Sequence, residues 1–155
     1  MKMENLNNNM IKIIDGGLAA DDRGVLSFAN EFGFEGVKRF YMVENFSTDV
    51  IRAWHGHLKE AKYVMVVSGS AIVAGVQMSD SQAPDKNAKV ERFVLSARKP
   101  NVIFIPAGYA NGFRPLENGT KIIYLSTSTL EESKGDDYRF PADYWGEKVW
   151  QVENR

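Results

Sequence analysis

Short runs of β-branched and aromatic residues recur along almost the whole chain, and turn residues separate them. No window keeps the 3.6-residue spacing of apolar residues that marks an amphipathic helix, so we expect few helices. Many short strands at this spacing are typical of an antiparallel sandwich or barrel. Ser68-Gly69 is typical of a tight hairpin turn. The predicted strands are 10–14, 24–28, 37–45, 50–55, 62–67, 71–76, 90–95, 102–105, 112–115 and 121–126.

The length of the chain predicts a single domain over residues 1–155. Residues 1–9 are polar and rich in asparagine, and we expect them to be loose. Thr127–Arg155 carries five aromatic residues, and a tail that can bury so much apolar area is unlike a disordered one. We therefore expect this C-terminal segment to wrap over the barrel or its mouth.

Charge and residue usage exclude several classes of protein. Nineteen basic residues balance 20 acidic ones, whereas nucleic-acid and membrane surfaces need a strong basic bias. The absence of cysteine excludes disulfides, thiolate nucleophiles and cysteine-bound zinc. No apolar run has the length of a membrane helix, and MKMENLNNNM lacks the apolar region of a secretory signal. We therefore expect a cytoplasmic protein that binds neither nucleic acid nor membrane.

The two histidines of the chain, His55 and His57, stand two residues apart on a predicted strand. Residues i and i+2 point to the same face, so both imidazoles can enter one cavity, with Lys62 beginning the next strand. The alternative is an exposed polar edge. Trp54 should lie on the opposite face and pack in the core or an interface. Strict alternation places Arg52 with Trp54, so a role for Arg52 beside the histidines requires a bulge.

The same residues raise the question of a metal site. His-X-His followed by glutamate is the pattern of metal-binding cupins, and Glu60 follows His57 at nearly the right distance. The position of their third histidine holds Asn111, whose amide is a poor ligand for the metals that prefer imidazole. Two histidines and a carboxylate still leave a facial triad open, but we expect neither a metal nor another cofactor.

Six short motifs stand in order along about 120 residues. They are Asp22-Arg23-Gly24, Tyr41–Ser47, Arg52–His57, Val66–Ser70, Ile105–Phe113 and Phe140–Trp145. Together they resemble the motifs of the dTDP-4-dehydrorhamnose 3,5-epimerases and the related dTDP-sugar 3,4-ketoisomerases, which are cupins. The resemblance implies an all-β cupin (jelly-roll) antiparallel barrel.

The resemblance also implies roles for individual residues. It makes His55 the catalytic base, Asp143 the carboxylate that orients it, and Lys62 the group that faces the sugar C4 oxygen. The residues implied to bind the substrate are Arg23, Asn45, Arg52, His57 and Asn111.

These roles suit inversion next to a ketone. A neutral imidazole can remove the carbon-bound proton, a carboxylate can fix its tautomer, and a cation can stabilise the enolate. We therefore expect a metal-independent isomerase that inverts C3, or C3 and C5, of a nucleotide-linked 4-keto-6-deoxy hexose for surface-polysaccharide synthesis. The partners expected are the nucleotide-diphosphate sugar and a second copy of the chain, because such cupins pair by exchanging N-terminal strands.

Two departures from the family pattern keep other functions open. Asn111 replaces a histidine, and Thr129 or Leu130 stands where the acid tyrosine is expected. Without an opposed acid, the base can return the proton to the same face or move it between carbons, as a 3,4-ketoisomerase does. A cupin that binds a sugar nucleotide without turnover is the third possibility.

Overall fold

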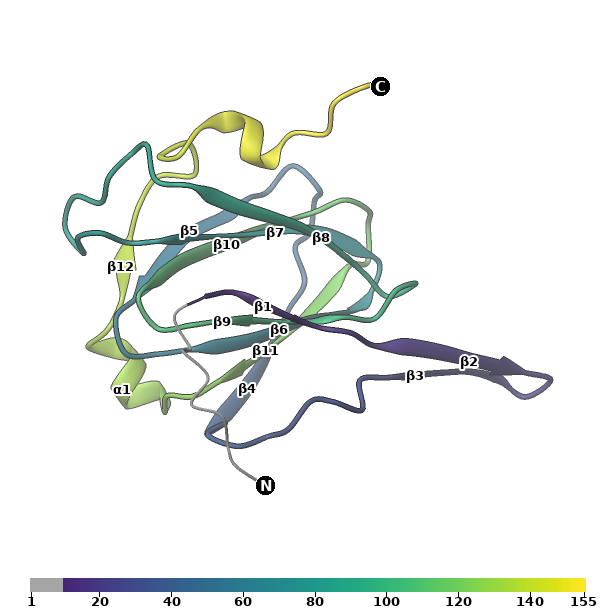
Figure 1. The fold of residues 1–155 in the computed structure, drawn as a ribbon. Helices are drawn as coiled ribbons and strands as arrows, with labels where there is room; N and C mark the ends of the chain where they lie inside the picture. The colour runs from purple at the N-terminus through teal and green to yellow at the C-terminus, as the bar shows by residue number, and fades with distance from the viewer. Residues whose placement is uncertain (1–9) are drawn as a thin grey trace.

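The protein is built from two β-sheets that face each other, with a hairpin projecting from one side (Figure 1). The computed structural model describes residues 10–155, so the expectation for residues 1–9 lies outside it. In chain order the elements are β1 (Lys12–Ile14), β2 (Gly17–Asp21), β3 (Gly24–Phe28), β4 (Arg39–Val43), β5 (Arg52–His57), β6 (Lys62–Ser68), β7 (Ser70–Gln77), β8 (Val90–Ser96), β9 (Val102–Ile105), β10 (Tyr109–Pro115), β11 (Lys121–Ser126), α1 (Leu130–Lys134), β12 (Tyr138–Arg139) and the 3-10 helix η1 (Glu147–Trp150).

Both large sheets have five strands, in the orders β1-β9-β6-β11-β4 and β12-β5-β10-β7-β8. Neighbouring strands are antiparallel throughout the two sheets. This confirms the predicted antiparallel all-β architecture with little helix. None of the helices within residues 10–155 has the length and apolar character needed to cross a bilayer.

All ten predicted strands lie on observed ones, but two details of the prediction are wrong. The strand β2 was missed because its sequence, GLAAD, lacks the β-branched and aromatic residues that signal a strand. The Ser68-Gly69 turn does not close a hairpin, because β6 and β7 belong to different sheets. Gly69, at a φ of +75°, instead carries the chain from one sheet to the other.

The main core fills the space between the two sheets. Apolar side chains from both sheets meet there, and they include Val64 and Ile122 from the first sheet and Val73 and Phe113 from the second. The strand β7 is buried on both faces, since Val73 points into this core while Ile72 packs on the other side. Six consecutive residues of β7 are therefore buried.

The later part of the segment after β11, residues 140–150, covers the outer face of the second sheet (Figure 1). Trp54 is fully buried there and packs edge-on against Trp145, with ring centroids 5.0 Å apart. The indole N–H groups of Trp54 and Trp150 both donate to the carbonyl oxygen of Ala142, at 3.2 and 2.9 Å. The prediction that Trp54 packs in a core, away from the face of His55, is confirmed.

Candidate active site

A pocket of about 230 Å³ opens between the inner faces of the two sheets. Its lining combines histidines, cationic side chains and two tyrosines. The lining residues are Arg39, Tyr41, Val43, Arg52, His55, His57, Lys62, Asn111, Phe113, Tyr124, Ser133, Asp137 and Arg139.

The strand β5 supplies both histidines because it alternates between its two faces. His55 and His57 line the pocket, while Trp54 points to the opposite side. Arg52 lines the pocket as well. The pairing of β5 with β10 shifts register between His55 and Arg52. Strict alternation would have placed Arg52 on the face of Trp54, and this irregularity lets it share the pocket with His55.

His55 is uncharged at neutral pH. Burial, with the nearby positive charges of Arg139 and Lys62, lowers its pKa to about 4, against the smaller upward effect of Asp137. Within residues 10–155, neither ring nitrogen of His55 has a hydrogen-bond partner; its backbone carbonyl accepts a bond from the amide of Asn111 at 3.3 Å. The imidazole is therefore held in place by its strand and not by a partner group.

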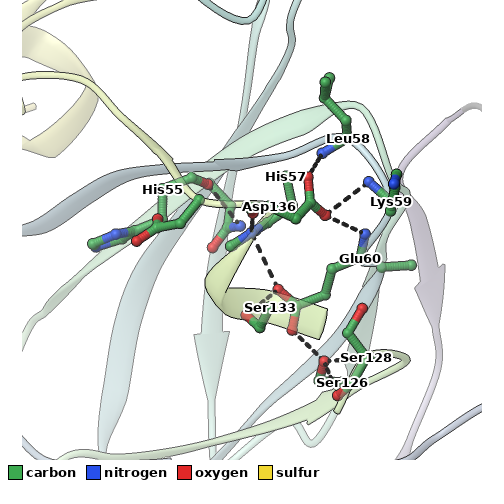
Figure 2. Close-up of polar contacts among 12 residues, drawn as sticks. His55, His57, Leu58, Lys59, Glu60, Ser126, Ser128, Ser133 and Asp136 are labelled. Atoms are coloured by element: carbon green, nitrogen blue, oxygen red, sulfur yellow. Dashed lines mark hydrogen bonds and ion pairs between the residues drawn. The ribbon is translucent and has the colours of Figure 1, made fainter. Parts of the chain in front are cut away.

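His57, in contrast, is anchored on one side. Its Nδ1 lies 2.5 Å from the backbone oxygen of Asp136 and 3.1 Å from Oε2 of Glu60 (Figure 2). Burial and Lys62 lower the pKa of His57, whereas Asp136 and Glu60 oppose that shift. Its Nε2 is buried and has no hydrogen-bond partner in the described chain.

The turn after β5 is fixed by the carboxylate of Asp136. This side chain accepts three backbone N–H bonds, from Leu58 at 2.7 Å, Lys59 at 2.9 Å and Glu60 at 3.0 Å (Figure 2). Asp136 is itself buried. One residue thus holds the turn with its side chain and the ring of His57 with its backbone oxygen.

Glu60 lies beneath the pocket, with a side chain that is 0% exposed. Its carboxylate accepts bonds from Arg39 at 3.1 Å, from Ser133 at 3.2 Å and from the hydroxyl of Ser126. In a metal site of the cupin type, this carboxylate would face both histidines. Here the carboxylate contacts Nδ1 of His57 and not His55. Among residues 10–155, no three His, Cys, Asp or Glu side chains are grouped so that they could hold a metal ion.

Lys62 begins β6 and reaches into the pocket beside a pair of tyrosines. Its Nζ lies 5.7 Å from the ring centre of Tyr41 and 5.6 Å from that of Tyr124. The two rings stack at 5.1 Å. An ammonium over aromatic faces is stabilised without an ion pair, so its positive charge stays directed at the pocket.

Two of the residues predicted for the site lie elsewhere. Asp143 was expected beside His55, but it is exposed in the turn at residues 142–145, which belongs to the segment covering the outer face of the sheet. His55 faces inwards, and the carboxylate near it is Asp137. Arg23 lies at the tip of the β2–β3 hairpin, where it pairs with Asp21 and is 87% exposed.

Asn45 acts through another residue. Its side-chain oxygen accepts a bond from Nε of Arg52 at 2.6 Å, and its amide donates to the carbonyl oxygen of Val50 at 2.9 Å. It therefore aims Arg52 at the pocket without lining the pocket itself. Thr129 and Leu130 are the two positions expected for the acid tyrosine. Thr129 caps α1 by accepting a bond from the N–H of Glu132, and Leu130 is the first residue of that helix.

The sequence reasoning missed several lining residues, among them Arg39, Tyr41, Tyr124, Asp137 and Arg139. Tyr41 and Tyr124 had a signal, since both stand on predicted strands of aromatic and β-branched residues. Asp137 and Arg139 had none, because their place depends on β12 pairing with β5 at the edge of the sheet.

Comparison with known proteins agrees with this geometry. The family model described as dTDP-4-dehydrorhamnose 3,5-epimerase matches residues 10–142. No curated protein sequence matches the chain.

Among solved structures, similar ones include the rmlC epimerase of Mycobacterium tuberculosis (TM-score 0.73, 20% identity, 97% of this chain and 78% of that one). A second is a 3,4-ketoisomerase from Helicobacter canadensis (TM-score 0.65, 20% identity, 90% of this chain and 96% of that one). A third is the 3,5-epimerase RmlC of Legionella pneumophila in complex with dTDP-4-keto-L-rhamnose (TM-score 0.72, 18% identity, 94% of this chain and 80% of that one). These neighbours confirm the cupin-type barrel, and they are isomerases. With most of its length matched by the family model, the chain belongs to the dTDP-4-dehydrorhamnose 3,5-epimerase family.

Proposed function

We propose that the protein is a nucleotide-sugar isomerase that inverts C3, or C3 and C5, of a nucleotide-linked 4-keto-6-deoxy hexose. The observation that carries the proposal is the pairing of an uncharged His55 with the ammonium of Lys62 in one pocket. Removal of a proton next to a ketone needs a base that is neutral at working pH. It also needs a positive group at the oxygen where charge develops. No step of this reaction requires a metal.

In the proposed mechanism, His55 takes the carbon-bound proton and Lys62 stabilises the enolate oxygen. Asp137, and not Asp143, is the carboxylate whose charge favours the imidazolium that forms. Asn111 supports the strand by donating to the backbone oxygen of His55. Fixed charges that face the developing oxyanion are usually the largest contribution to such catalysis.

The size of the pocket suggests which part of the substrate lies inside it. Pockets that enclose a whole drug-sized molecule span roughly 300–1,000 Å³, and this one has about 230 Å³. We infer that the sugar ring enters it while the nucleotide lies at the mouth. Arg39, Arg52 and Arg139 line the same pocket, and guanidinium groups suit a diphosphate because they bind its oxygens in pairs.

A 3,4-ketoisomerase is the second candidate, and one observation favours it. His57 lines the pocket beside His55, and its Nε2 has no partner among residues 10–155, so two bases can serve neighbouring carbons. Of the two positions expected for the acid, Thr129 caps α1 and Leu130 begins it. Tyr41 and Tyr124 are the tyrosines that line the pocket, and they are the candidates to deliver a proton to the opposite face in an epimerase.

Proton exchange in D2O tests the function. The protein would be incubated with the 4-keto-6-deoxy-glucose derivatives of dTDP, GDP and CDP and followed by NMR, with His55→Asn as the matched variant. Deuterium at C3, or at C3 and C5, that is lost in the variant is the expected result for an epimerase. A 3-keto product would identify a ketoisomerase. Nucleotide binding without any exchange would contradict the proposal and favour a non-catalytic binding protein.

We also propose that the chain works as a homodimer in the cytoplasm. The β2–β3 hairpin leaves the barrel, and no other strand within residues 10–155 pairs with it (Figure 1). It exposes Leu18, Val25 and Leu26, and an isolated two-stranded hairpin is marginal in water. Exchange of these hairpins would bury them and bring Arg23 to a second copy, where it would bind substrate. A monomer in sedimentation velocity at micromolar concentration would refute the dimer.

A further inference from the structure

The two imidazoles of the pocket differ in how they are held. Neither ring nitrogen of His55 has a hydrogen-bond partner in residues 10–155, whereas Nδ1 of His57 faces two oxygens, from Asp136 at 2.5 Å and Glu60 at 3.1 Å. A nitrogen that faces two acceptors must carry the proton, because an unprotonated nitrogen would repel both. The neutral ring of His57 therefore has its lone pair on Nε2.

That lone pair is in an unusual position. Nε2 of His57 is buried and finds no partner in the described chain, while its residue lines the pocket next to Lys62 and Asn111. Buried polar atoms in native proteins are almost always paired, so an unpaired acceptor at a pocket wall points to a ligand group. Lys62 disfavours a second positive charge at this point.

Glu60 adds a negative charge to this arrangement, next to the backbone oxygen of Asp136. Its side chain is fully buried and is not part of the pocket lining, so it cannot touch a substrate. Arg39, Ser126 and Ser133 all donate to its carboxylate, which keeps the carboxylate oriented. The oxygen that meets Ser133 is also the one that meets His57.

We propose that Glu60 positions His57 as a proton acceptor of this pocket: its carboxylate supports the Nδ1 proton that the backbone oxygen of Asp136 holds, and it stabilises the imidazolium that forms when Nε2 takes a proton. The proposal rests on the proposed function. In the reaction, His55 remains the base for one carbon next to the reacting oxygen, and His57 serves a neighbouring carbon. At the carbon that His57 serves, the C–H bond breaks and its electron pair forms the enolate, whose oxygen faces Lys62. The proton forms an N–H bond at Nε2 of His57. It then returns to carbon, or moves to the neighbouring carbon, and His57 becomes neutral again.

The charged and titratable groups around His57 come from four parts of the chain. Glu60 lies in the turn after β5, Asp136 precedes β12, Lys62 begins β6, and His55 shares β5. Glu60 and Asp136 favour the imidazolium, and Lys62 disfavours it. Removing the charge of Glu60 alone should therefore lower the pKa of His57, while the backbone oxygen of Asp136 keeps the proton on Nδ1.

Nitrogen NMR of 15N-histidine-labelled protein tests this without any substrate. The chain contains two histidines, so the His55→Asn variant assigns both signals. In the wild type, His57 should be protonated on Nδ1 at neutral pH. Glu60→Gln should lower the pKa of His57 while the backbone oxygen of Asp136 keeps the proton on Nδ1. Glu131→Gln, which changes an exposed glutamate paired with Lys134, should leave that pKa unchanged. An unchanged titration of His57 in Glu60→Gln would overturn the proposal.

A second variant covers the case in which Glu60→Gln fails to fold by circular dichroism. Ser133→Ala removes a competing donor from Oε2 of Glu60, so the carboxylate should hold the imidazolium more firmly and the pKa of His57 should rise. No rise would overturn the proposal in that case.

The catalytic readout separates this proposal from the proposed function. With a 4-keto sugar that the wild type turns over, Glu60→Gln should lower kcat at least about tenfold with little change in KM. The acidic limb of its pH profile should move to lower pH. Equal kcat and pH profiles would contradict the role of Glu60, whereas a wild type that exchanges no proton contradicts the proposed function and leaves the NMR result to judge Glu60.

Discussion

The carboxylate of Asp136 gives a prediction whose size follows from its contacts. The side chain is buried and accepts backbone N–H bonds from Leu58, Lys59 and Glu60 at 2.7–3.0 Å. Asp136→Asn replaces one oxygen by an NH2 group, which must then face at least one of these N–H groups. One charge-assisted bond is worth about 1.5–3 kcal/mol, and a buried donor left unpaired adds about 1–3 kcal/mol.

Because the turn can relax in part, we expect a net loss of about 2–4 kcal/mol in the free energy of unfolding. For a chain of this length, each 1 kcal/mol lowers Tm by about 2–4 °C, so Tm should fall by about 5–15 °C. Urea unfolding followed by tryptophan fluorescence measures the free energy, and differential scanning calorimetry measures Tm.

The neighbouring residue offers a matched control. Asp137 forms a partly exposed ion pair with Arg139 at 3.1 Å, and such pairs contribute about 0–1 kcal/mol. Asp137→Asn should therefore change the unfolding free energy by less than about 1 kcal/mol. If Asp136→Asn lowers the unfolding free energy no more than Asp137→Asn does, the three backbone bonds do not stabilise the turn. In that case Asp136 does not hold His57 in the way described above.

Three further predictions concern the pocket and its walls. The unfolding free energy should fall as the pH drops from about 6.5 towards 4, because an unfolded His55 takes up a proton that the folded one, with a pKa of about 4, refuses; an equal fall in His55→Asn would contradict this. Gly112→Ala should cost about 1–3 kcal/mol in urea unfolding, since its new Cβ would lie 2.4 Å from that of Ala53. Gly33→Ala, with open space around it, is the control and should cost less than about 0.5 kcal/mol. Lys62→Gln should slow proton exchange by roughly 10²–10³-fold with dTDP binding retained, and a rate within threefold of wild type would refute its role at the oxyanion.

Local geometry explains what the sequence predicted well. His55 and His57 line one pocket, and Trp54 packs on the far side of β5, because side chains alternate along any strand. A place for Arg52 beside the histidines required a bulge in the strand, and the register shift in β5 is such an irregularity.

Long-range placement explains what it predicted poorly. Asp137 and Asp143 stand six residues apart in the same charged tail, and nothing in the sequence says which of them passes the pocket. The choice is made where β12 joins the edge of β5, after which the chain crosses to the outer face. The sequence placed Glu60 in a metal-binding motif. In the structure its carboxylate instead pairs with Arg39 and His57, which folding brings together.

The burial of β7 on both faces has a consequence for how the protein is made. Its run Ser70–Gln77 carries no charge and no proline, the composition of an aggregation-prone segment when exposed. Residues that cover its outer side, such as Trp145, Val149 and Trp150, leave the ribosome only after every strand of the two sheets. During that interval the nascent chain presents a bare apolar sheet, so the growing polypeptide is a natural client for chaperones, and stalled or shortened translation products should precipitate.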